Sequence, residues 1–516
     1  PGGPTATVAP DPGLVADALA EDRAVLRLGP GADRYPVVLA AVRAPTAVPG
    51  GHALVLCPSV AEARTLGGRL RRDGVRVAVV TGEGVAGAGE WARARAGAVV
   101  VGARSAAWAP VAPLGRVVVL DEHDEAYQEE SSPTWHARDV VAERARRAGA
   151  PCLLVSPVPS LEALGWGRLL TDGRGAERAA WPRVEVVDQR DLDPALGPLF
   201  SPALVALVRG PGRVLCVLNR TGRARLLACT ACTTLARCAV CDAAVGLAAG
   251  PATEATGEGD GGGADQSGEP APPGTGRGGD TDAGDAVEHL ACGRCGATRP
   301  VVCLSCGGTR FKNLRLGVSR AREELEALAG EPVAELTAAT PDGDAAVRDA
   351  RIVIGTEAVL HRIGRADAVA FLDADQELLA LRYRAAEQAI ALLARAARVV
   401  RRGADGHGRI VVQTRTPDHP VLVAARLADP GRLVDAELPM RRALGLPPAV
   451  AMAIVSGQAA PAFVEALGRP EGVAVQGPVD GAWRVRAPDH RVLCDALAAV
   501  DRPPGRLRIE VDPLGS

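Results

Sequence analysis

Four Cys-x-x-Cys pairs in the middle of the sequence constrain this chain most strongly. A tight turn of this spacing directs two thiolates at one tetrahedral ion, and two such turns complete a four-cysteine zinc site. A single pair is also compatible with a redox dithiol, whereas four pairs in succession predict two zinc ions per chain. The pairs are Cys229/Cys232, Cys238/Cys241, Cys292/Cys295 and Cys303/Cys306.

The spacing between the pairs favours a nested arrangement of the two sites. Only the short segment Thr233–Arg237 separates the first two pairs, which leaves little chain for them to face each other. We therefore expect the first and fourth pairs to share zinc 1, and the second and third pairs to share zinc 2. The long insertion between the inner pairs is tolerable, because lengthening a closed loop several-fold costs only about 1 kcal/mol. Structural zinc contributes roughly 10–16 kcal/mol.

That insertion, residues 250–286, is rich in glycine, proline and acidic residues, and Arg277 is its only basic residue. Such a segment buries too little apolar surface to order itself, so we expect a disordered loop. Its acidic residues offset basic residues elsewhere, so the formal net charge of the whole chain is only −2. The remainder is mildly basic, which is compatible with nucleic-acid binding but does not require it.

The sequence also favours a cytoplasmic setting. No apolar run approaches the length of a membrane-spanning helix, and the Pro-Gly-rich start lacks the pattern of a signal peptide. In the cytoplasm, paired cysteines indicate metal binding rather than disulfides.

Outside the cysteine region, short β-branched runs alternate with Ala/Arg-rich helical stretches. The runs lack polar alternation, which is typical of strands buried on both faces of a parallel sheet. Two series of runs predict two tandem α/β lobes. The first series is Ala53–Cys57, Val77–Val80, Ala98–Gly102, Val117–Leu120 and Cys152–Val155, and the second is Val214–Leu218, Val333–Leu336, Ile352–Ile354, Ala368–Leu372 and Ile410–Gln413.

These patterns divide the chain into six segments, with the zinc module interrupting the second lobe after its first strand. The expected segments are a linker at 1–22, lobe 1 at 23–190, the start of lobe 2 at 191–228, the zinc module at 229–310, the remainder of lobe 2 at 311–436 and a small α+β domain at 437–516.

Several motifs in this order resemble the family of primosomal protein N′ (PriA), the replication restart proteins, in a form with degenerate helicase motifs as in actinobacteria. Val99–Tyr127 resembles the family's GTRSALF segment and DEEH box, and Ser156–Leu164 its SATPSLE motif. The other matching segments are WHARD (Trp135–Asp139), VLNRTG (Val217–Gly222), IVIGTEAVL (Ile352–Leu360), FLDAD (Phe371–Asp375), RYRAAEQ (Arg382–Gln388), RRALGLPP (Arg441–Pro448) and VDP (Val511–Pro513).

The resemblance implies two RecA-like helicase lobes that bind stalled or forked replication structures and help to reload the replicative helicase. It implies forked or single-stranded DNA as a partner, in the nucleoid. It also implies contacts with other primosome proteins, the replicative helicase and the single-stranded-DNA-binding protein.

The resemblance does not extend to ATP hydrolysis. A P-loop needs a lysine on the phosphates and a hydroxyl on Mg²⁺. The corresponding segment keeps Gly29 and Gly31, but Arg34 stands at the lysine position and Tyr35 at the hydroxyl position. Arginine does not replace the compact charge of lysine, and the only lysine in the chain, Lys312, lies far away.

Other nucleotide-binding residues are also incomplete. Asp121 and Glu122 form a pair like that of a Walker B motif, compatible with either a metal site or a structural remnant. The two arginine-finger positions of the family fall on Val399 and Arg402. We expect no catalytic residue here, and whether a nucleotide binds without turnover stays open.

Residues in the family's DNA-facing segments predict contacts with nucleic acid. Arginine binds phosphate, and Trp or His stacks on unpaired bases. Packing is the alternative role for the two tryptophans, and a buried, hydrogen-bonded state the alternative for the histidine. The candidates are Arg104, Trp108, Trp135, His136, Arg138 and Arg220.

We therefore interpret the chain as a zinc-bearing, DNA-binding component of replication restart on a helicase fold without its motor. Two alternatives are an ATP-dependent 3′–5′ DNA helicase and a zinc-ribbon scaffold that binds only proteins.

Overall fold

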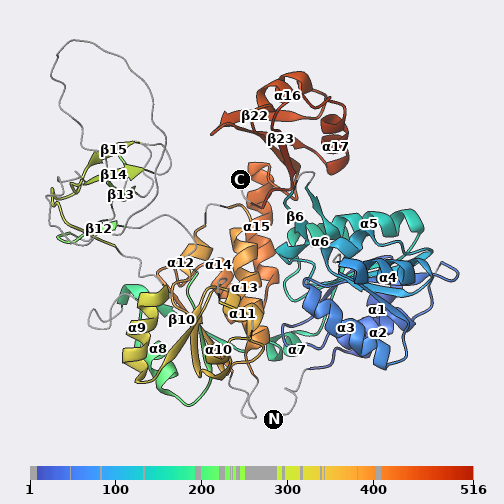
Figure 1. The fold of residues 1–516 in the computed structure, drawn as a ribbon, viewed down its shortest axis with the longest axis horizontal. Helices are drawn as coiled ribbons and strands as arrows, with labels where there is room; N and C mark the ends of the chain where they lie inside the picture. The colour runs from blue at the N-terminus through green and yellow to red at the C-terminus, as the bar shows by residue number, and fades with distance from the viewer. Residues whose placement is uncertain are drawn as a thin grey trace, which may run out of the picture. The chain divides into compact units, whose positions relative to one another are not determined.

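The computed structural model forms two compact units, Pro1–Asn219 with Glu326–Ser516, and Arg220–Leu325. The first unit contains two α/β lobes and a C-terminal domain, and the second contains the cysteine region (Figure 1). The structure describes residues 8–46, 48–81, 84–131, 134–191, 199–219, 227–232, 234, 236, 238–239, 245–249, 288–292, 297–313, 318–337, 340–341, 343–380, 382–401 and 408–514.

Lobe 1 is built on a seven-stranded sheet in which every strand pairs in parallel with its neighbours, in the order β3-β4-β2-β5-β8-β1-β9. The strands are β1 (Arg23–Arg27), β2 (His52–Leu56), β3 (Val77–Val80), β4 (Val99–Gly102), β5 (Leu114–Leu120), β8 (Cys152–Ser156) and β9 (Arg168–Thr171).

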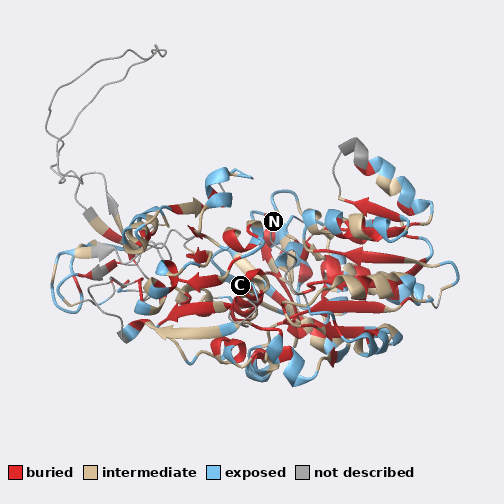
Figure 2. Ribbon diagram, turned by 90° about the horizontal axis from the view of Figure 1, so that it is seen from below, coloured by how far each residue is buried: buried red, intermediate tan, exposed pale blue. Residues whose placement is uncertain are grey.

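Helices cover both faces of this sheet, so the central strands are buried on both sides (Figure 2). The core on one face contains residues of α1, α2 and α3, and the core on the other contains residues of α5. The helices and short elements of lobe 1 are α1 (Pro12–Ala20), α2 (Tyr35–Arg43), α3 (Val60–Arg72), α4 (Gly84–Arg95), η1 (Arg104–Trp108), η2 (Glu125–Tyr127), β6 (Gln128–Glu129), β7 (Trp135–His136), α5 (Ala137–Ala148), α6 (Leu161–Trp166) and α7 (Arg174–Ala179).

Lobe 2 has a six-stranded parallel sheet in the order β10-β20-β19-β11-β18-β17. The strands are β10 (Arg183–Asp188), β11 (Val214–Val217), β17 (Val333–Leu336), β18 (Ile352–Gly355), β19 (Ala368–Phe371) and β20 (Arg409–Thr414). The helices are η3 (Gln189–Asp191), α8 (Pro202–Arg209), α9 (Val318–Ala329), α10 (Ala345–Asp349), α11 (Ala358–Arg362), α12 (Asp375–Leu378), α13 (Ala385–Val399), α14 (Pro420–Arg426) and α15 (Gly431–Leu444).

The longest of these helices, α13, is apolar on the side that packs into lobe 2. Its alanines and leucines recur at helical spacing, and ten of its residues are buried. The remaining stripe carries arginines and polar residues, and this stripe reaches lobe 1.

The C-terminal domain is a four-stranded antiparallel sheet, in the order β22-β23-β21-β24, with two helices packed against it. Its elements are β21 (Ala451–Ser456), α16 (Ala460–Leu467), β22 (Ala474–Val479), β23 (Ala482–Ala487), α17 (His490–Ala498) and β24 (Arg508–Val511).

The cysteine unit contains two small antiparallel sheets, one pairing β12 with β16 and the other in the order β13-β14-β15. The strands are β12 (Leu227–Cys229), β13 (Val245–Ala249), β14 (Glu288–Cys292), β15 (Thr298–Pro300) and β16 (Phe311–Asn313). The acidic insertion at 250–286 lies outside the described residues.

Two segments differ from the sequence-based boundaries. Residues 12–20 of the expected linker form α1, which is part of the lobe 1 core through Val15 and Ala18. The edge strand β10, expected in lobe 1, pairs in parallel with β20 and so belongs to the sheet of lobe 2. Both were missed because neither carries a continuous apolar run. Among the described residues, no helix combines the length and apolar character needed to span a membrane.

Candidate metal centre and interlobe carboxylate site

Four thiols of the cysteine unit lie together, supplied by the first and last Cys-x-x-Cys pairs. The Sγ atoms of Cys229, Cys232, Cys303 and Cys306 all lie within 4.8 Å of one another. The shortest separations are 3.6 Å between Cys229 and Cys306, and 3.6 Å between Cys232 and Cys303. A tetrahedral zinc with Zn–S bonds of about 2.3 Å places its sulfur atoms roughly 3.8 Å apart. The geometry of these thiols fits one zinc ion.

Local backbone turns explain how the two pairs reach this geometry. Cys229 ends β12, and its N–H donates to the carbonyl of Thr234 at 2.9 Å. In the other pair, the N–H of Gly307 donates to the carbonyl of Cys303 at 2.9 Å, with Gly307 at a φ of +73°. A Cβ atom at Gly308 would lie 3.1 Å from the Cys229 Sγ atom, so a side chain there would crowd the cluster.

The second expected site is described only in part. Cys238 is buried, and Cys292 lies at the end of β14. Cys241 and Cys295 lie outside the described residues, so zinc 2 stays a prediction.

In lobe 1, the loop between β1 and α2 occupies the place of a P-loop, but its side chains serve other contacts. The hydroxyl of Tyr35 donates to Asp73, and burial followed by this contact raises the pKa of Tyr35 to about 12. This hydroxyl is therefore not directed at a metal beside Asp121. Gly29 packs so closely on Ala180 that an added Cβ would lie 1.9 Å from the Ala180 Cβ atom.

Asp121 is held by two arginines, one from each lobe. It follows β5, its side chain is 2% exposed, and Arg34 donates to its Oδ2 atom. The guanidinium of Arg398, on α13, contacts both carboxylate oxygens at 2.8 Å. Burial alone would raise the pKa of Asp121, but the charges of Arg34 and Arg398 outweigh it and hold the pKa far below its ordinary value. The carboxylate is therefore charged and internally neutralised.

The neighbouring Glu122 is buried and also fully engaged. Its Oε1 atom accepts from the backbone N–H of Ser160 at 2.8 Å, and its Oε2 atom accepts from the Ser160 hydroxyl at 2.8 Å. Arg138 adds a contact of 3.3 Å to Oε2. Glu122 thus fixes the start of α6, where Ser160 is the N-cap.

These contacts do not fit a bound Mg²⁺–nucleotide. A metal at Asp121 would have to displace two guanidinium groups, and the Nε atom of Arg398 also approaches the carbonyl of Pro30 at 3.3 Å. The loop has neither lysine nor a free hydroxyl to compensate.

Sequence reasoning missed the two arginines of α13 that contact lobe 1. Arg398, one residue before the position aligned with a finger arginine, pairs with Asp121, and Arg395 pairs with Asp124. Val399 is buried in lobe 2, and Arg402 lies outside the described residues. Arginines three residues apart on a largely apolar helix were the available signal.

The predicted DNA contacts separate into exposed and buried groups. Trp108 is 55% exposed and meets Trp135 edge to face, with ring centroids 5.4 Å apart. Arg104 is 37% exposed, and it contacts the carbonyl of Gln128 at 2.6 Å and Glu129 at 3.1 Å. Arg220 lies outside the described residues. The two tryptophans and Arg104 form a partly exposed group on lobe 1, which we name the tryptophan patch.

His136 and Arg138 have structural partners. The Nδ1 atom of His136 accepts the N–H of Arg138 at 3.2 Å, which caps α5. Burial, and then the nearby Arg138 charge, lower the pKa of His136 to about 3. Arg138 is buried and pairs with Asp139 at 2.9 Å. In this structure both side chains support lobe 1 rather than present themselves to a ligand, and their DNA contacts stay predictions.

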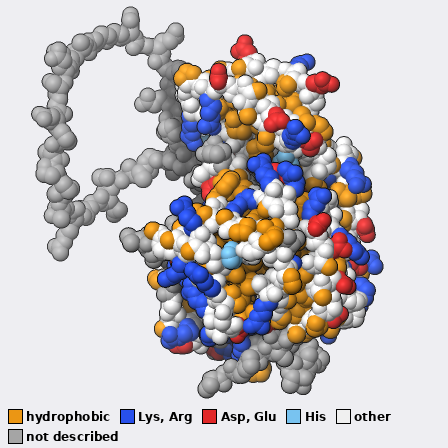
Figure 3. Space-filling model, turned by 90° about the vertical axis from the view of Figure 1, so that its right-hand side faces the viewer, with side chains coloured by type: hydrophobic (Ala, Val, Ile, Leu, Met, Phe, Trp, Pro, Cys, Tyr) orange, Lys and Arg blue, Asp and Glu red, His pale blue; other side chains and the backbone are white. Residues whose placement is uncertain are grey.

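Charge is distributed unevenly over the surface. On the face shown in Figure 3, the described basic side chains form several separate patches among apolar and acidic ones. DNA binding through this face would therefore depend on local contacts rather than on one broad basic surface.

A replication restart protein PriA from Haemophilus influenzae is 28% identical over 72% of this chain and 49% of its own length. Probable replication restart proteins PriA from Mycobacterium leprae and Mycobacterium tuberculosis are each 30% identical, over 76% and 79% of this chain. Both matches cover 57% of those proteins. The chain thus spans about half the length of these curated relatives, and no family model matches it.

Solved structures add little to this comparison. A DEAD box protein from Methanococcus jannaschii has a TM-score of 0.36 and 10% identity, covering 84% of this chain and 89% of that chain. The Escherichia coli DExH-box NTPase HrpB has a TM-score of 0.38 and 13% identity, covering 79% and 41%. Both scores are too low to carry an argument.

Two parallel α/β lobes, with a cysteine unit that follows β11 in the sequence, define a two-lobe α/β protein with a cysteine-rich unit. Within that class, the chain is similar to curated replication restart proteins PriA, and this similarity confirms the resemblance seen in its motifs.

Proposed function

We propose that this protein binds DNA at stalled or forked replication structures and helps to reload the replicative helicase without hydrolysing ATP. The observation that carries the proposal is the state of Asp121, whose oxygens are taken by Arg34 and Arg398. Phosphoryl transfer depends on positioned cations and metal around the phosphates. Because Arg34 and Arg398 already neutralise this carboxylate, Asp121 would not be available to hold the Mg²⁺ ion that ATP hydrolysis requires.

DNA binding needs no nucleotide in this proposal. The tryptophan patch offers an exposed ring for base stacking, and Arg104 offers a guanidinium for phosphate. The relatives are called replication restart proteins, which supports DNA at damaged forks as the target. The proposed partners are the replicative helicase, other primosome proteins and the single-stranded-DNA-binding protein, and the proposed location is the nucleoid.

The cysteine unit supplies a rigid zinc-bearing element in this proposal. Cys229, Cys232, Cys303 and Cys306 would hold zinc 1. Two zinc ions per chain remain our expectation.

One experiment tests the function. Labelled forked, single-stranded and duplex DNA are titrated with the protein while ATP turnover is measured in the same samples. We expect binding that weakens steeply with salt, as phosphate counterions are released, and turnover equal to that of buffer. DNA-stimulated turnover that disappears in Asp121→Ala would establish the helicase alternative instead.

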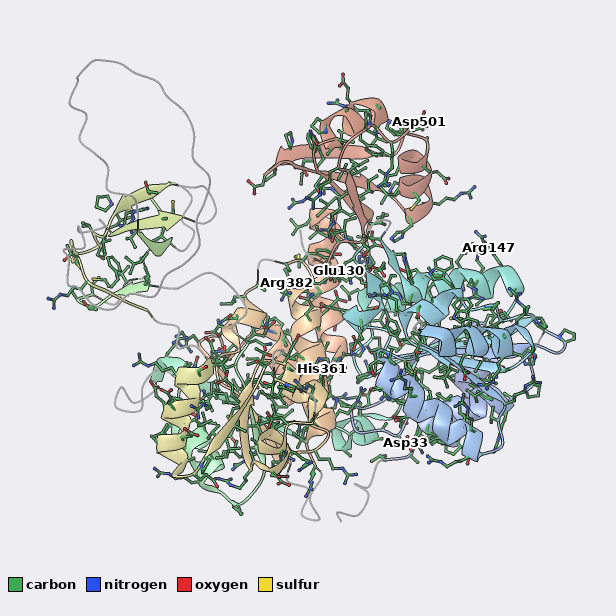
Figure 4. All side chains as sticks on the ribbon, viewed as in Figure 1. Asp33, Glu130, Arg147, His361, Arg382 and Asp501 are labelled. Atoms are coloured by element: carbon green, nitrogen blue, oxygen red, sulfur yellow. The ribbon has the colours of Figure 1, made fainter. Side chains whose placement is uncertain are left out.

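A matched pair of variants localises the binding. Arg104→Ala should weaken DNA binding, whereas Arg147→Ala, at the outer surface of α5, should not (Figure 4). Absence of DNA binding even at low salt would favour the scaffold that binds only proteins.

A further inference from the structure

One side of α13 bridges the two lobes over the whole length of the helix. Arg384, at the N-cap, contacts the Oε1 atom of Glu162 in lobe 1 at 2.5 Å. In the first turn of the helix, the Oε1 atom of Glu387 accepts the backbone N–H of Leu161 at 3.0 Å. At the C-terminal end, Arg395 pairs with Asp124 and Arg398 with Asp121.

The spacing of these residues makes the bridge a property of one helix face. Residues three or four positions apart lie on the same side of a helix, as do 384 with 387 and 395 with 398. The two pairs are separated by eight residues, a little over two turns, which keeps them on one side. The groups that they contact in lobe 1 all lie just beyond the carboxyl ends of β5 and β8. A single helix therefore joins two neighbouring strand ends of lobe 1.

Asp121, at the C-terminal end of the bridge, is the most buried carboxylate among the ion pairs that this bridge makes with lobe 1. Its side chain is 2% exposed, and the Arg398 side chain is 29% exposed. Two parallel hydrogen bonds from one guanidinium fix both distance and orientation. Arg34, from lobe 1, contacts the same carboxylate, so Asp121 joins cations from both lobes.

We infer that α13 and Arg34 form a nucleotide-independent clamp, which holds the two lobes closed through Asp121. In this clamp, Arg398 is a positioning residue, because its guanidinium holds lobe 2 against the Asp121 carboxylate of lobe 1. The chain's own side chains hold the lobes together in this way, so the tryptophan patch would keep one fixed relation to lobe 2. The inference concerns lobe geometry and goes beyond the proposed function, because it holds whether or not DNA binds.

Single-molecule energy transfer between the lobes tests this clamp in the full chain. Dyes on genetically encoded azido residues at Arg72 of α3 and Arg348 of α10, both exposed, avoid the native cysteines. We expect the unmodified clamp to give one narrow population that Mg²⁺–ATP leaves unchanged. Arg398→Ala and Asp121→Asn should each raise the fraction of open molecules by on the order of 100-fold.

Controls separate opening from general damage. Arg147→Ala removes an exposed ion pair within α5 and should leave the distribution unchanged. The double variant Asp121→Asn/Arg398→Ala should open no more than the stronger single variant, because the two substitutions remove the same contact between the lobes. If either single variant fails to fold, Arg395→Ala removes a neighbouring contact of the same helix and should also increase the open fraction.

Unchanged energy transfer in the folded clamp variants would overturn the inference, as would a shift of the unmodified chain on adding Mg²⁺–ATP. DNA binding measured on the same samples keeps the two ideas apart. A closed clamp without DNA binding would contradict only the proposed function. DNA binding without ATP turnover by a chain that opens or closes with Mg²⁺–ATP would contradict only the clamp.

Discussion

The cysteine cluster and the Asp121 site both gather groups that could hold a metal, yet they differ in what surrounds those groups. The four Sγ atoms of the cluster face one another within 4.8 Å, with spacing that fits zinc. The oxygens of Asp121 face guanidinium groups from Arg34 and Arg398 instead. Residue type alone therefore does not make a metal site, because the donor atoms must also be left unused by the rest of the protein.

The largest expected effect concerns the cluster. Elemental analysis of the purified chain should give two zinc ions, and Cys303→Ser should remove zinc 1, because structural zinc binding contributes roughly 10–16 kcal/mol. Cys292→Ser should remove zinc 2. The exposed Cys494, changed to serine, is the control and should leave both ions in place.

The outcomes of that measurement separate two claims. A chain with one zinc or none would contradict the double site. Loss of the same ion in Cys303→Ser and Cys292→Ser would contradict only the nested pairing.

A smaller effect on stability is expected at the Asp121 site. Arg398→Ala should lower the free energy of unfolding by roughly 3 kcal/mol, because Asp121 would stay buried with one fewer partner. Urea unfolding monitored by tryptophan fluorescence measures this change. Arg147→Ala, which alters only an exposed pair, should leave the midpoint nearly unchanged. Equal midpoints for all three proteins would mean that Asp121 is not held as described.

Substitution in the tryptophan patch should lower the affinity for DNA by a smaller amount of free energy than the loss of stability expected at Asp121. Trp108→Ala should weaken binding of single-stranded DNA by about 10-fold, because loss of one stacked base contact costs about 1–3 kcal/mol. Trp108→Phe keeps an aromatic face and should retain most of the affinity. Fluorescence anisotropy at two salt concentrations provides the measurement, and equal affinity of the alanine variant would assign Trp108 to another role.

The smallest effect concerns pH. The pKa of His136 is lowered from 6.5 to about 3 by burial and then by Arg138. Below pH 6.5 the unfolded chain takes up a proton that the folded chain does not, so stability falls as the pH drops towards 3. We expect a loss of up to about 1.4 kcal/mol per pH unit from this group.

His136→Asn offers the matched comparison for this pH effect. Asparagine can still cap α5 but does not titrate. Urea midpoints measured between pH 7.5 and 5.5 should therefore fall less steeply in this variant. Identical slopes would show that other groups dominate the acid response.

The strands were most predictable where they are apolar along their whole length. Val77–Val80 was predicted with the bounds of β3, and all four of its residues are buried. The predicted run Val333–Leu336 also has the bounds of β17, although it contains Glu335 and only its two end residues are buried. By contrast, β10 has a mixed sequence with an exposed or half-buried pattern, so only its pairing with β20 reveals it.

Sequence alone predicted which cysteines form the cluster, because two thiols separated by two residues can face one point through a local turn. It also determined that the P-loop lacks its lysine and hydroxyl, since those are matters of residue identity. Only the tertiary structure decided that Arg398 reaches Asp121 and that Tyr35 turns to Asp73. Such contacts join segments far apart in the chain, and the packing of one lobe on the other sets which oxygen lies within reach of which guanidinium.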